Sequence, residues 1–199
     1  MNRRGFGVAD SDPVRVSTER LRLEPVRPEH ADDLVLLHSS PDIAFWYGGT
    51  WTKAEAQEWA AQMEHRWQHE AVGKWMAYRL ADGELIGRGG LSWADICGQR
   101  RLELGWAIRE QHRGHGYATE IGRAGLAFAF DTLAAEEVVA FTEVHNHASR
   151  AVMARLGMTQ IGQIYRPGLI EGRTGIHNAA PFALYRINRN QSSVRTKLS

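Results

Sequence analysis

The segment Arg109–Glu120, with the sequence REQHRGHGYATE, lies between two stretches of different hydrophobic periodicity. Residues 101–108 before it alternate polar and apolar side chains, as a half-buried strand does. After it, apolar residues recur at helical spacing from Ala118 to Ala129. We therefore expect a glycine-containing turn from a strand into a helix. Such a turn directs several backbone N–H groups and the positive end of a helix dipole at one point, which suits a phosphate group.

The composition is typical of a soluble globular protein. Its 199 residues are 43% hydrophobic and 24% charged, which fits one domain with a sizeable core. A formal net charge of +1 gives no argument for nucleic acid or an anionic membrane as a partner. Cys97 is the only cysteine, and no apolar run has transmembrane length, so we expect a cytoplasmic protein without an internal disulfide. Arg3 and Arg4 are not followed by the apolar region of an export signal.

The N-terminal part predicts an arm, a strand and two helices. Residues 1–17 are polar and aperiodic, and we expect a flexible arm there. Residues 21–26 alternate as a first strand, and Pro28 begins a helix to about His38, after which Pro41 ends the region. Thr52 and Glu55 form a capping-box pattern for a helix that reaches about His69. Between these helices, the sequence FWYGGTW from Phe45 to Trp51 is expected to be an aromatic loop.

The remaining elements predict a mixed sheet with one crossover. Further strands are expected at residues 75–80, 84–93, 101–108, 138–142, 159–165 and 181–187. The helix after the glycine-containing turn at 109–120 joins the fourth and fifth strands, which makes these two strands parallel. A short helix begins at Asn146 and ends at Gly157. We therefore predict a single α/β domain over residues 18–187, with a mostly antiparallel sheet of six to seven strands flanked by helices, and a polar tail at 188–199.

The sequence argues against three other kinds of site. The turn lacks a dinucleotide fingerprint, because Thr119 occupies its sixth position, and it lacks the Gly-Lys-Ser/Thr of a P-loop. The histidine pairs His112/His115 and His145/His147 have no cysteine partners and are not spaced i, i+4 on a helix, so we expect no metal.

Four motifs occur in one order along the chain. They are TERLRL at 18–23 with VRPEHA at 26–31, ELGW at 103–106, Gln111-x-x-Gly114-x-Gly116-Tyr117-Ala118, and Asn146-x-x-Ser149-x-x-Val152-Met153-x-x-Leu156-Gly157-Met158. Together they resemble the GNAT superfamily of N-acetyltransferases, specifically its RimJ/RimL-like branch. The resemblance covers residues 17 to 187 and implies the GNAT fold, in which the fourth and fifth strands splay apart.

This resemblance implies acetyl-CoA as co-substrate. The loop amides would hold the CoA pyrophosphate, and the pantetheine arm would pair with the fourth strand and contact Asn146. The cofactor-binding residues implied in this way are Trp106, Ala107, Ile108, Arg113, Gly114, His115, Gly116, Tyr117, Ala118, Asn146 and Ser149. Asn146 is also a good helix N-cap, and one side chain can serve both roles.

The reaction implied is direct attack of a neutral amine on the thioester in a ternary complex. Glu103 is the first candidate for the general base, acting through water; alternatively it is a solvent-facing strand residue or a partner of Arg101. Glu171 in the late loop is the second candidate. The leaving thiolate needs a hydrogen-bond donor, and many GNAT enzymes use a tyrosine where this chain has Met153. Ser149 is the catalytic donor that the RimJ/RimL-like pattern offers instead.

The acceptor is left open between a protein N-terminus and a small amine, and the acyl group between acetyl and a larger one. Trp46, Tyr47 and Trp51 either form part of the acceptor wall or pack in the core, and Glu171 is a further substrate-binding candidate. The resemblance allows a homodimer. A second class of function is a non-catalytic acyl-CoA-binding sensor or partner-binding module. The two classes differ in one measurable property, because only the enzyme releases free thiol when it is offered an amine.

Overall fold

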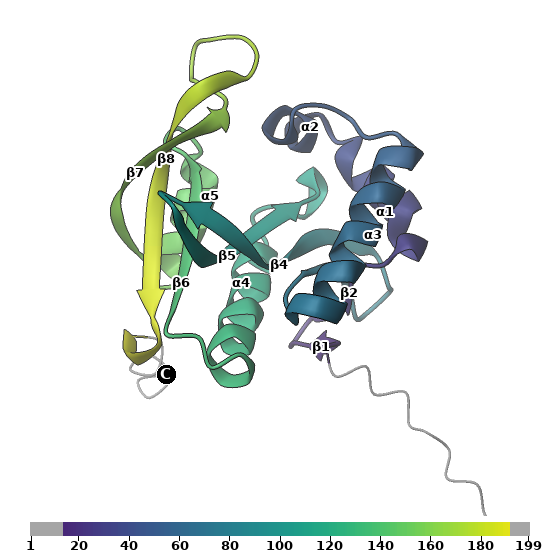
Figure 1. The fold of residues 1–199 in the computed structure, drawn as a ribbon. Coiled ribbons are helices and arrows are strands. Elements are labelled where there is room, and N and C mark those ends of the chain that lie inside the picture. The colour runs from purple at the N-terminus through teal and green to yellow at the C-terminus, as the bar shows by residue number, and fades with distance from the viewer. Residues whose placement is uncertain (1–13, 192–199) are drawn as a thin grey trace, which may run out of the picture.

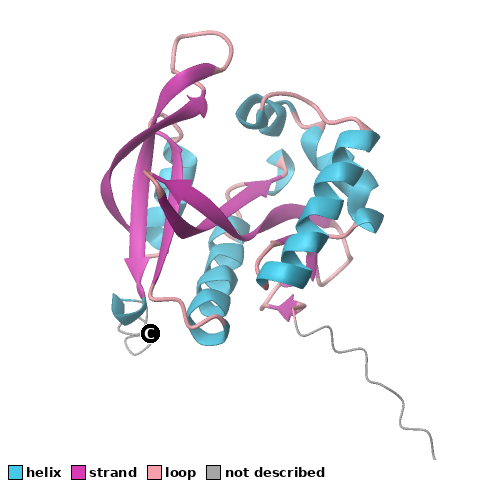
Figure 2. Ribbon diagram, viewed as in Figure 1, coloured by secondary structure: helices cyan, strands magenta, loops and turns pink. Residues whose placement is uncertain are grey.

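The computed structural model describes residues 14–191 as an eight-stranded mixed sheet with helices on both faces (Figures 1 and 2). The spatial strand order is β1-β2-β3-β4-β5-β6-β8-β7. The strands are β1 (Val16–Ser17), β2 (Leu21–Pro25), β3 (Lys74–Arg79), β4 (Leu85–Ile96), β5 (Gln99–Ile108), β6 (Glu137–Glu143), β7 (Thr159–Gly168) and β8 (His177–Asn188). The helices are α1 (Ala31–His38), α2 (Pro41–Tyr47), α3 (Lys53–Glu70), α4 (Tyr117–Ala127) and α5 (His147–Arg155), with 3-10 turns at Pro28–His30 and Glu110–His112 and a π-helical turn at Phe128–Thr132.

The predicted α/β fold is confirmed, but the sheet has eight strands and not six to seven. The additional strand is β1, in which Val16 pairs with Leu23. Two residues are too short a segment for a period-2 pattern to be recognised. Because β1 lies within the predicted arm and β8 ends at Asn188, the sheet extends slightly beyond the predicted limits. The rest of the arm, 1–13, and of the tail, 192–199, lies outside the described residues.

Two apolar layers hold the helices on the sheet. On one face, Leu102 and Leu104 of β5 pack with Leu126 of α4 and Met153 of α5. On the other face, the core formed with α1 and α3 includes Ala107. Alternate residues of β5 therefore contact different helical layers, as the period of a strand requires. Among the described residues, no helix is long and apolar enough to cross a membrane.

Helix α2 corrects the prediction of an aromatic loop after Pro41. Pro41 begins this helix instead of ending the region, because proline is well suited to the first helical position, where its missing N–H is not needed. Ser40 precedes it in extended conformation, and Gly48 closes it with a φ of 80°. The aromatic residues Phe45 to Tyr47 therefore lie on a helix. Bulky aromatic side chains beside two glycines gave a loop signal, but the helix is stabilised by its contacts with α1.

The predicted helix starts at Thr52 and Asn146 are confirmed. Thr52 accepts from the Glu55 amide and the Glu55 carboxylate accepts from the Thr52 amide, which is the capping box expected for α3. Asn146 accepts from the Ser149 amide at the start of α5.

His38, at the end of α1, is fully buried and stacks on Trp51 with ring centroids 3.5 Å apart. Burial and the nearby positive charge of Arg88, whose Nη2 lies 3.5 Å from His38 Nε2, lower the pKa of His38 to about 3. Folded His38 thus stays neutral where the unfolded chain takes up a proton.

We expect the free energy of unfolding to contain a His38 contribution that is complete above pH 6.5. It falls as the pH decreases from 6.5 towards 3, by about 1.4 kcal/mol per pH unit, because only the unfolded state binds this proton. Denaturant unfolding at a series of pH values should give a shallower pH dependence for H38Q than for the wild type. H69Q, at an exposed histidine, is the control; equal slopes in all three proteins would contradict the assignment.

Candidate functional site

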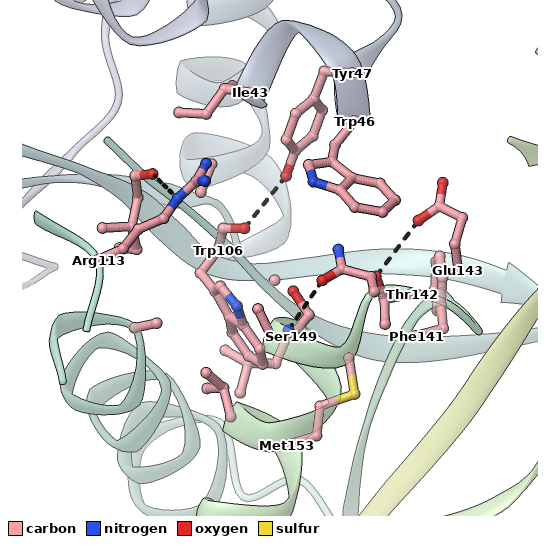
Figure 3. Close-up of a pocket in the computed structure, with 18 of the residues that line it drawn as sticks. Ile43, Trp46, Tyr47, Trp106, Arg113, Phe141, Thr142, Glu143, Ser149 and Met153 are labelled. Carbon is pink, nitrogen blue, oxygen red and sulfur yellow. Dashed lines mark hydrogen bonds between the residues drawn. The ribbon is translucent and has the colours of Figure 1, made fainter. Parts of the chain in front are cut away.

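A cavity of about 1010 Å³ opens between β5 and β6, at the upper end of the size range of ligand pockets (Figure 3). Its walls come from α2, the end of β5, the turn into α4, the end of β6, the start of α5 and the β7–β8 hairpin. These elements are distant in sequence and meet where the parallel strands separate. Figure 1 shows the same arrangement, with α4 between the N-terminal half of the sheet and strands β6 to β8.

The separation of β5 from β6 exposes a strand edge to the cavity. Strand β5 pairs with β4 from Gln99 to Ile108, but with β6 only at Glu103, opposite Val139. Residues 104–108 therefore have a partner strand on one side only, and they line the cavity on the other. An unpaired edge of this kind offers backbone N–H and C=O groups to an extended ligand.

The turn into α4 forms the anion-binding end of the cavity. The first hydrogen bond of the helix runs from Glu120 N to Gly116 O, at 3.0 Å, so the N–H groups at 117–119 have no partner in the helix. Gly116 is the N-cap with a φ of 83°, and Gly114 has a φ of 78°. At Gly116 a residue with a side chain would be strained, because this backbone conformation is left-handed. The orphan N–H groups and the helix dipole together favour an anion here.

Residues before β2 hold this turn in place. Arg20 Nη1 donates to the His115 carbonyl at 3.0 Å, and Arg20 Nε donates to the Glu120 carboxylate at 2.8 Å. The same carboxylate accepts from Thr18 Oγ1 at 2.6 Å. The guanidinium of Arg20 also lies 4.5 Å from the centre of the Tyr117 ring. The segment TERLRL therefore fixes the loop by contacts between residues about a hundred positions apart in the sequence. Sequence reasoning missed this role.

Arg113 connects the turn to α2. Its guanidinium forms an ion pair with Asp42, and its Nε lies 3.4 Å from the Ile108 carbonyl. Arg113 lines the cavity, so its charge lies beside the N–H groups of the turn.

Glu103 lies on the cavity wall and is ion-paired. Its Oε2 accepts from Lys74 Nζ at 3.0 Å and from Ser92 Oγ at 2.6 Å. Pairing with Arg101, one of the alternatives considered for Glu103, is wrong, because Arg101 Nε donates to Glu137 at 2.8 Å. Lys74 is buried and also donates to the Gly90 carbonyl. Burial lowers the pKa of Lys74, while the Glu103 carboxylate opposes this change.

The start of α5 faces the cavity from the opposite side. Asn146 uses its Oδ1 to accept from the Ser149 amide at 3.1 Å, which leaves its amide nitrogen free to donate to a ligand. Ser149 and Met153 also line the cavity (Figure 3). The thioether of Met153 cannot donate a hydrogen bond, so a hydroxyl donor on this helix comes from Ser149.

The aromatic residues predicted for the acceptor wall divide into two groups. Trp46 and Tyr47 of α2 line the cavity, and Tyr47 Oη donates to the Trp106 carbonyl at 3.4 Å. Trp51 does not reach it, because its ring stacks on His38 and packs against Trp59.

Two further predicted residues are absent from the cavity lining. Glu171 is exposed in the turn between β7 and β8. His115 is exposed and its Nδ1 contacts the Arg113 carbonyl, so only its place in the backbone of the turn fits the prediction. The other predicted site residues all line the cavity: Glu103, Trp106, Ala107, Ile108, Arg113, Gly114, Gly116, Tyr117, Ala118, Asn146, Ser149, Trp46 and Tyr47.

Sequence reasoning also missed two charged residues of the site. Lys74 pairs with Glu103 only through the register of three strands, which no local pattern reveals. Glu143, the last residue of β6, is buried and lines the cavity. A signal for Glu143 was available, since a carboxylate that ends an apolar run before Asn146 is unusual for a covered strand. Among residues 14–191, no group of three or more His, Cys, Asp or Glu side chains could hold a metal ion.

The fold and the cavity define a class: an α/β protein whose ligand cleft lies between splayed parallel strands and ends at an anion-binding helix start. A sequence model of the acetyltransferase (GNAT) domain matches residues 20–159. The chain belongs to the GNAT acetyltransferase family, as the resemblance of its motifs predicts.

Known proteins similar to this chain agree with that membership. It is 29% identical over 146 residues to YkkB of Bacillus subtilis, covering 73% of this chain and 85% of YkkB. It is 29% identical over 175 residues to the FsC-acetyl coenzyme A-N(2)-transacetylase of Aspergillus fumigatus, covering 78% and 72% of the two chains. The structure of a ribosomal-protein-S5-alanine acetyltransferase from Vibrio fischeri shares the fold, with a TM-score of 0.71, 14% identity, and coverage of 88% and 97%.

The Lys74–Glu103 pair generates a stability prediction. We expect K74M and E103L each to lower the free energy of unfolding by about 3 kcal/mol, because each leaves one buried charge without its partner. The double variant K74M/E103L should lose much less than the sum, since an apolar pair leaves no charge behind. Denaturant unfolding of the four proteins measures the coupling. Additive losses would show that the two charges do not stabilise each other in the folded protein.

Proposed function

We propose that this protein is an acetyl-CoA-dependent N-acetyltransferase that transfers an acetyl group to a primary amine within a ternary complex. The observation that carries the proposal is the continuity of one cavity, which joins the helix-start amides, the open edge of β5 and the carboxylate of Glu103. These three parts match the three needs of the reaction: an anchor for a diphosphate, a support for an amide-containing arm, and a base near the thioester.

Donor binding is assigned to the turn and the strand edge. The N–H groups of residues 114–118 bind the CoA diphosphate, since the Arg113 N–H already donates to the Glu110 carbonyl. The Arg113 guanidinium, which is ion-paired with Asp42, lies at the same place. The pantetheine arm pairs with backbone groups of Trp106 to Ile108, and the Asn146 amide nitrogen donates to it from α5. A strand N–H then lies near the thioester carbonyl and stabilises the oxyanion that forms on attack.

The chemical step is nucleophilic attack by the neutral amine on the thioester carbon. A lysine-type amine has a pKa of about 10.4, so its deprotonation at pH 7 costs about 4–5 kcal/mol. Glu103 receives this proton through a water molecule, and the contacts with Lys74 and Ser92 fix the orientation of the carboxylate. When the tetrahedral intermediate collapses, the C–S bond breaks, and Ser149 Oγ donates a hydrogen bond to the departing thiolate.

The acceptor enters from the side of α2, where Trp46 and Tyr47 form the wall. The relatives leave the acceptor class open: one carries a transacetylase name, and one fold neighbour is a ribosomal-protein acetyltransferase. A cytoplasmic setting, predicted from the single cysteine, is compatible with this reaction.

A second function is favoured by one feature, the methionine at position 153. Without a tyrosine at this place, protonation of the leaving group depends on Ser149. If Ser149 does not serve this role, the chain binds acyl-CoA without turnover and acts as a sensor. Both functions require that acetyl-CoA binds the folded chain, but only the enzyme releases free CoA.

Two measurements test these proposals together. Acetyl-CoA at a hundred times its Kd should raise the Tm by about 5–10 °C, because it binds only the folded state. Thiol release should then follow when amines are offered from a panel of peptides, amino acids and polyamines. A Tm increase without thiol release would establish the sensor, and no Tm increase would exclude both functions.

We expect E103Q to lower kcat by about 100-fold while the KM for acetyl-CoA stays the same, because the amide cannot accept the amine proton. The pH–rate profile should also become steeper on the acid side, since the variant depends on amine that is already neutral. E58Q, which removes an exposed carboxylate from α3, is the matched control and should retain wild-type kcat. An unchanged kcat in E103Q would exclude Glu103 as the base.

The two tryptophans should behave differently. W46A should raise the KM for the acceptor at an unchanged Tm, because Trp46 lies on the cavity wall. W51A should leave the acceptor KM unchanged but lower the free energy of unfolding by roughly 2 kcal/mol, because Trp51 packs on buried His38 and is itself only half-buried. Steady-state kinetics and denaturant unfolding of both variants check this. A change in acceptor KM in W51A alone would reverse the assignment.

A further inference from the structure

Glu143 occupies the acceptor side of the cavity. Along β6, Val138 and Ala140 pack in the core with α4 and α5, whereas Val139 packs in the cluster on the opposite face. Because side chains alternate along a strand, Glu143 belongs to the same face as Val139, away from α5. Val139 is the register partner of Glu103, and both carboxylates line the cavity. Figure 3 shows the Glu143 carboxylate on the side of the Trp46 indole.

The Glu143 carboxylate has no cationic partner. Within residues 14–191 its only side-chain hydrogen bond comes from Thr142 Oγ1 at 3.5 Å, and no ion pair is formed. The residue is nevertheless only 7% exposed. Glu103, the other carboxylate of the cavity, is already paired with Lys74. A buried carboxylate without a counter-charge is costly, so this position favours a cation supplied by a ligand.

Strand β7 passes close to this carboxylate at Gly168. A Cβ at Gly168 of β7 would lie 3.1 Å from Glu143 Oε1 and 2.6 Å from the Phe182 ring, so glycine is required for this close approach. The nearby Arg166 also lines the cavity, but its guanidinium lies over the Phe141 ring at 4.7 Å and donates to the Asp95 carbonyl at 2.9 Å. These contacts direct the guanidinium to the Phe141 ring and the Asp95 carbonyl, and Arg166 forms no ion pair with Glu143.

The Trp46 indole lies on the same side of the cavity as the Glu143 carboxylate (Figure 3). Trp46 lies 5.2 Å from His145, measured between ring centroids, and His145 is two residues beyond Glu143. An indole face beside a carboxylate attracts an ammonium group by cation–π and Coulomb interactions together.

We propose that Glu143 binds a second ammonium group of the acceptor, so that the preferred substrate is a small diamine or polyamine. This inference rests on the proposed acetyl transfer. Glu143 is four residues beyond the register partner of Glu103, which is about 13 Å of backbone along the strand direction. One amine is then acetylated near Glu103, and the distal ammonium stays protonated and paired with Glu143. An amine without a second charge leaves Glu143 unpaired and binds more weakly.

The test compares α,ω-diaminoalkanes with monoalkylamines of equal chain length, by thiol release from acetyl-CoA. The wild type should have a kcat/KM for the best diamine at least tenfold above that for its monoamine. E143Q should raise the diamine KM about tenfold, which abolishes the preference for the diamine over its monoamine. E143D, which retains the charge, should recover part of the diamine affinity, and E58Q should behave as the wild type.

The outcomes are distinguishable. If E143Q has a lower Tm, the monoamine kinetics of the same sample report whether the active site is intact. Equal kcat/KM values for diamines and monoamines in the wild type would overturn this inference and leave the proposed acetyl transfer standing. A higher kcat/KM for peptides than for any diamine would do the same. Absence of thiol release with every amine would overturn the proposed function, and this inference with it.

Discussion

The separation of β5 from β6 after a single residue pair is the constraint on which the site depends. A strand edge inside a sheet is unfavourable when its N–H and C=O groups lack partners. Here the edge is tolerated because β5 is held along its whole length by β4, and because α4 and α5 support the two strands from one face. An amide-containing ligand can then supply the missing backbone hydrogen bonds.

The charges of the cavity are divided between its two ends. Positive potential is concentrated at the turn into α4, where orphan N–H groups and Arg113 lie together. Two carboxylates, Glu103 and Glu143, lie on the wall that we propose for the acceptor, where Arg166 also lines the cavity. In the proposed function, an anionic donor and a cationic acceptor would therefore bind at different walls. Lys74 offsets only the carboxylate of Glu103, which leaves the two carboxylates with different electrostatic environments.

Short sequence patterns are sufficient to predict the individual strands, turns and helix caps of this fold. The strand before Arg109, the turn with Gly114 and Gly116, and the caps at Thr52 and Asn146 each depend on residues within one short segment. Most of the cavity lining that we propose for the donor lies in these segments, so the sequence indicates its position.

Tertiary contacts determine the parts that the sequence did not reveal. Trp51 shares a short aromatic segment with Trp46, so the sequence leaves it open between the acceptor wall and the core. Its stacking on buried His38 places it against the core. Helix α2 looked like a loop because its stabilising contacts come from α1. Glu171 is displaced from the site because the β7–β8 hairpin is longer than its apolar pattern, which carries the connecting turn away from the cavity.

The donor and acceptor sides of this cavity consequently differ in how they can be identified. The proposed donor side uses backbone groups, so its sequence signature is a pattern of glycines and helix starts. The proposed acceptor side uses side chains from α2, the end of β6 and β7, which only the assembled fold brings together. Glu143 illustrates the difference, since its proposed role in binding depends on the absence of an ion-pair partner among the described residues and on the space left by Gly168. An unpaired buried charge is a property of the assembled fold, and it carries information about a substrate that no motif in this sequence contains.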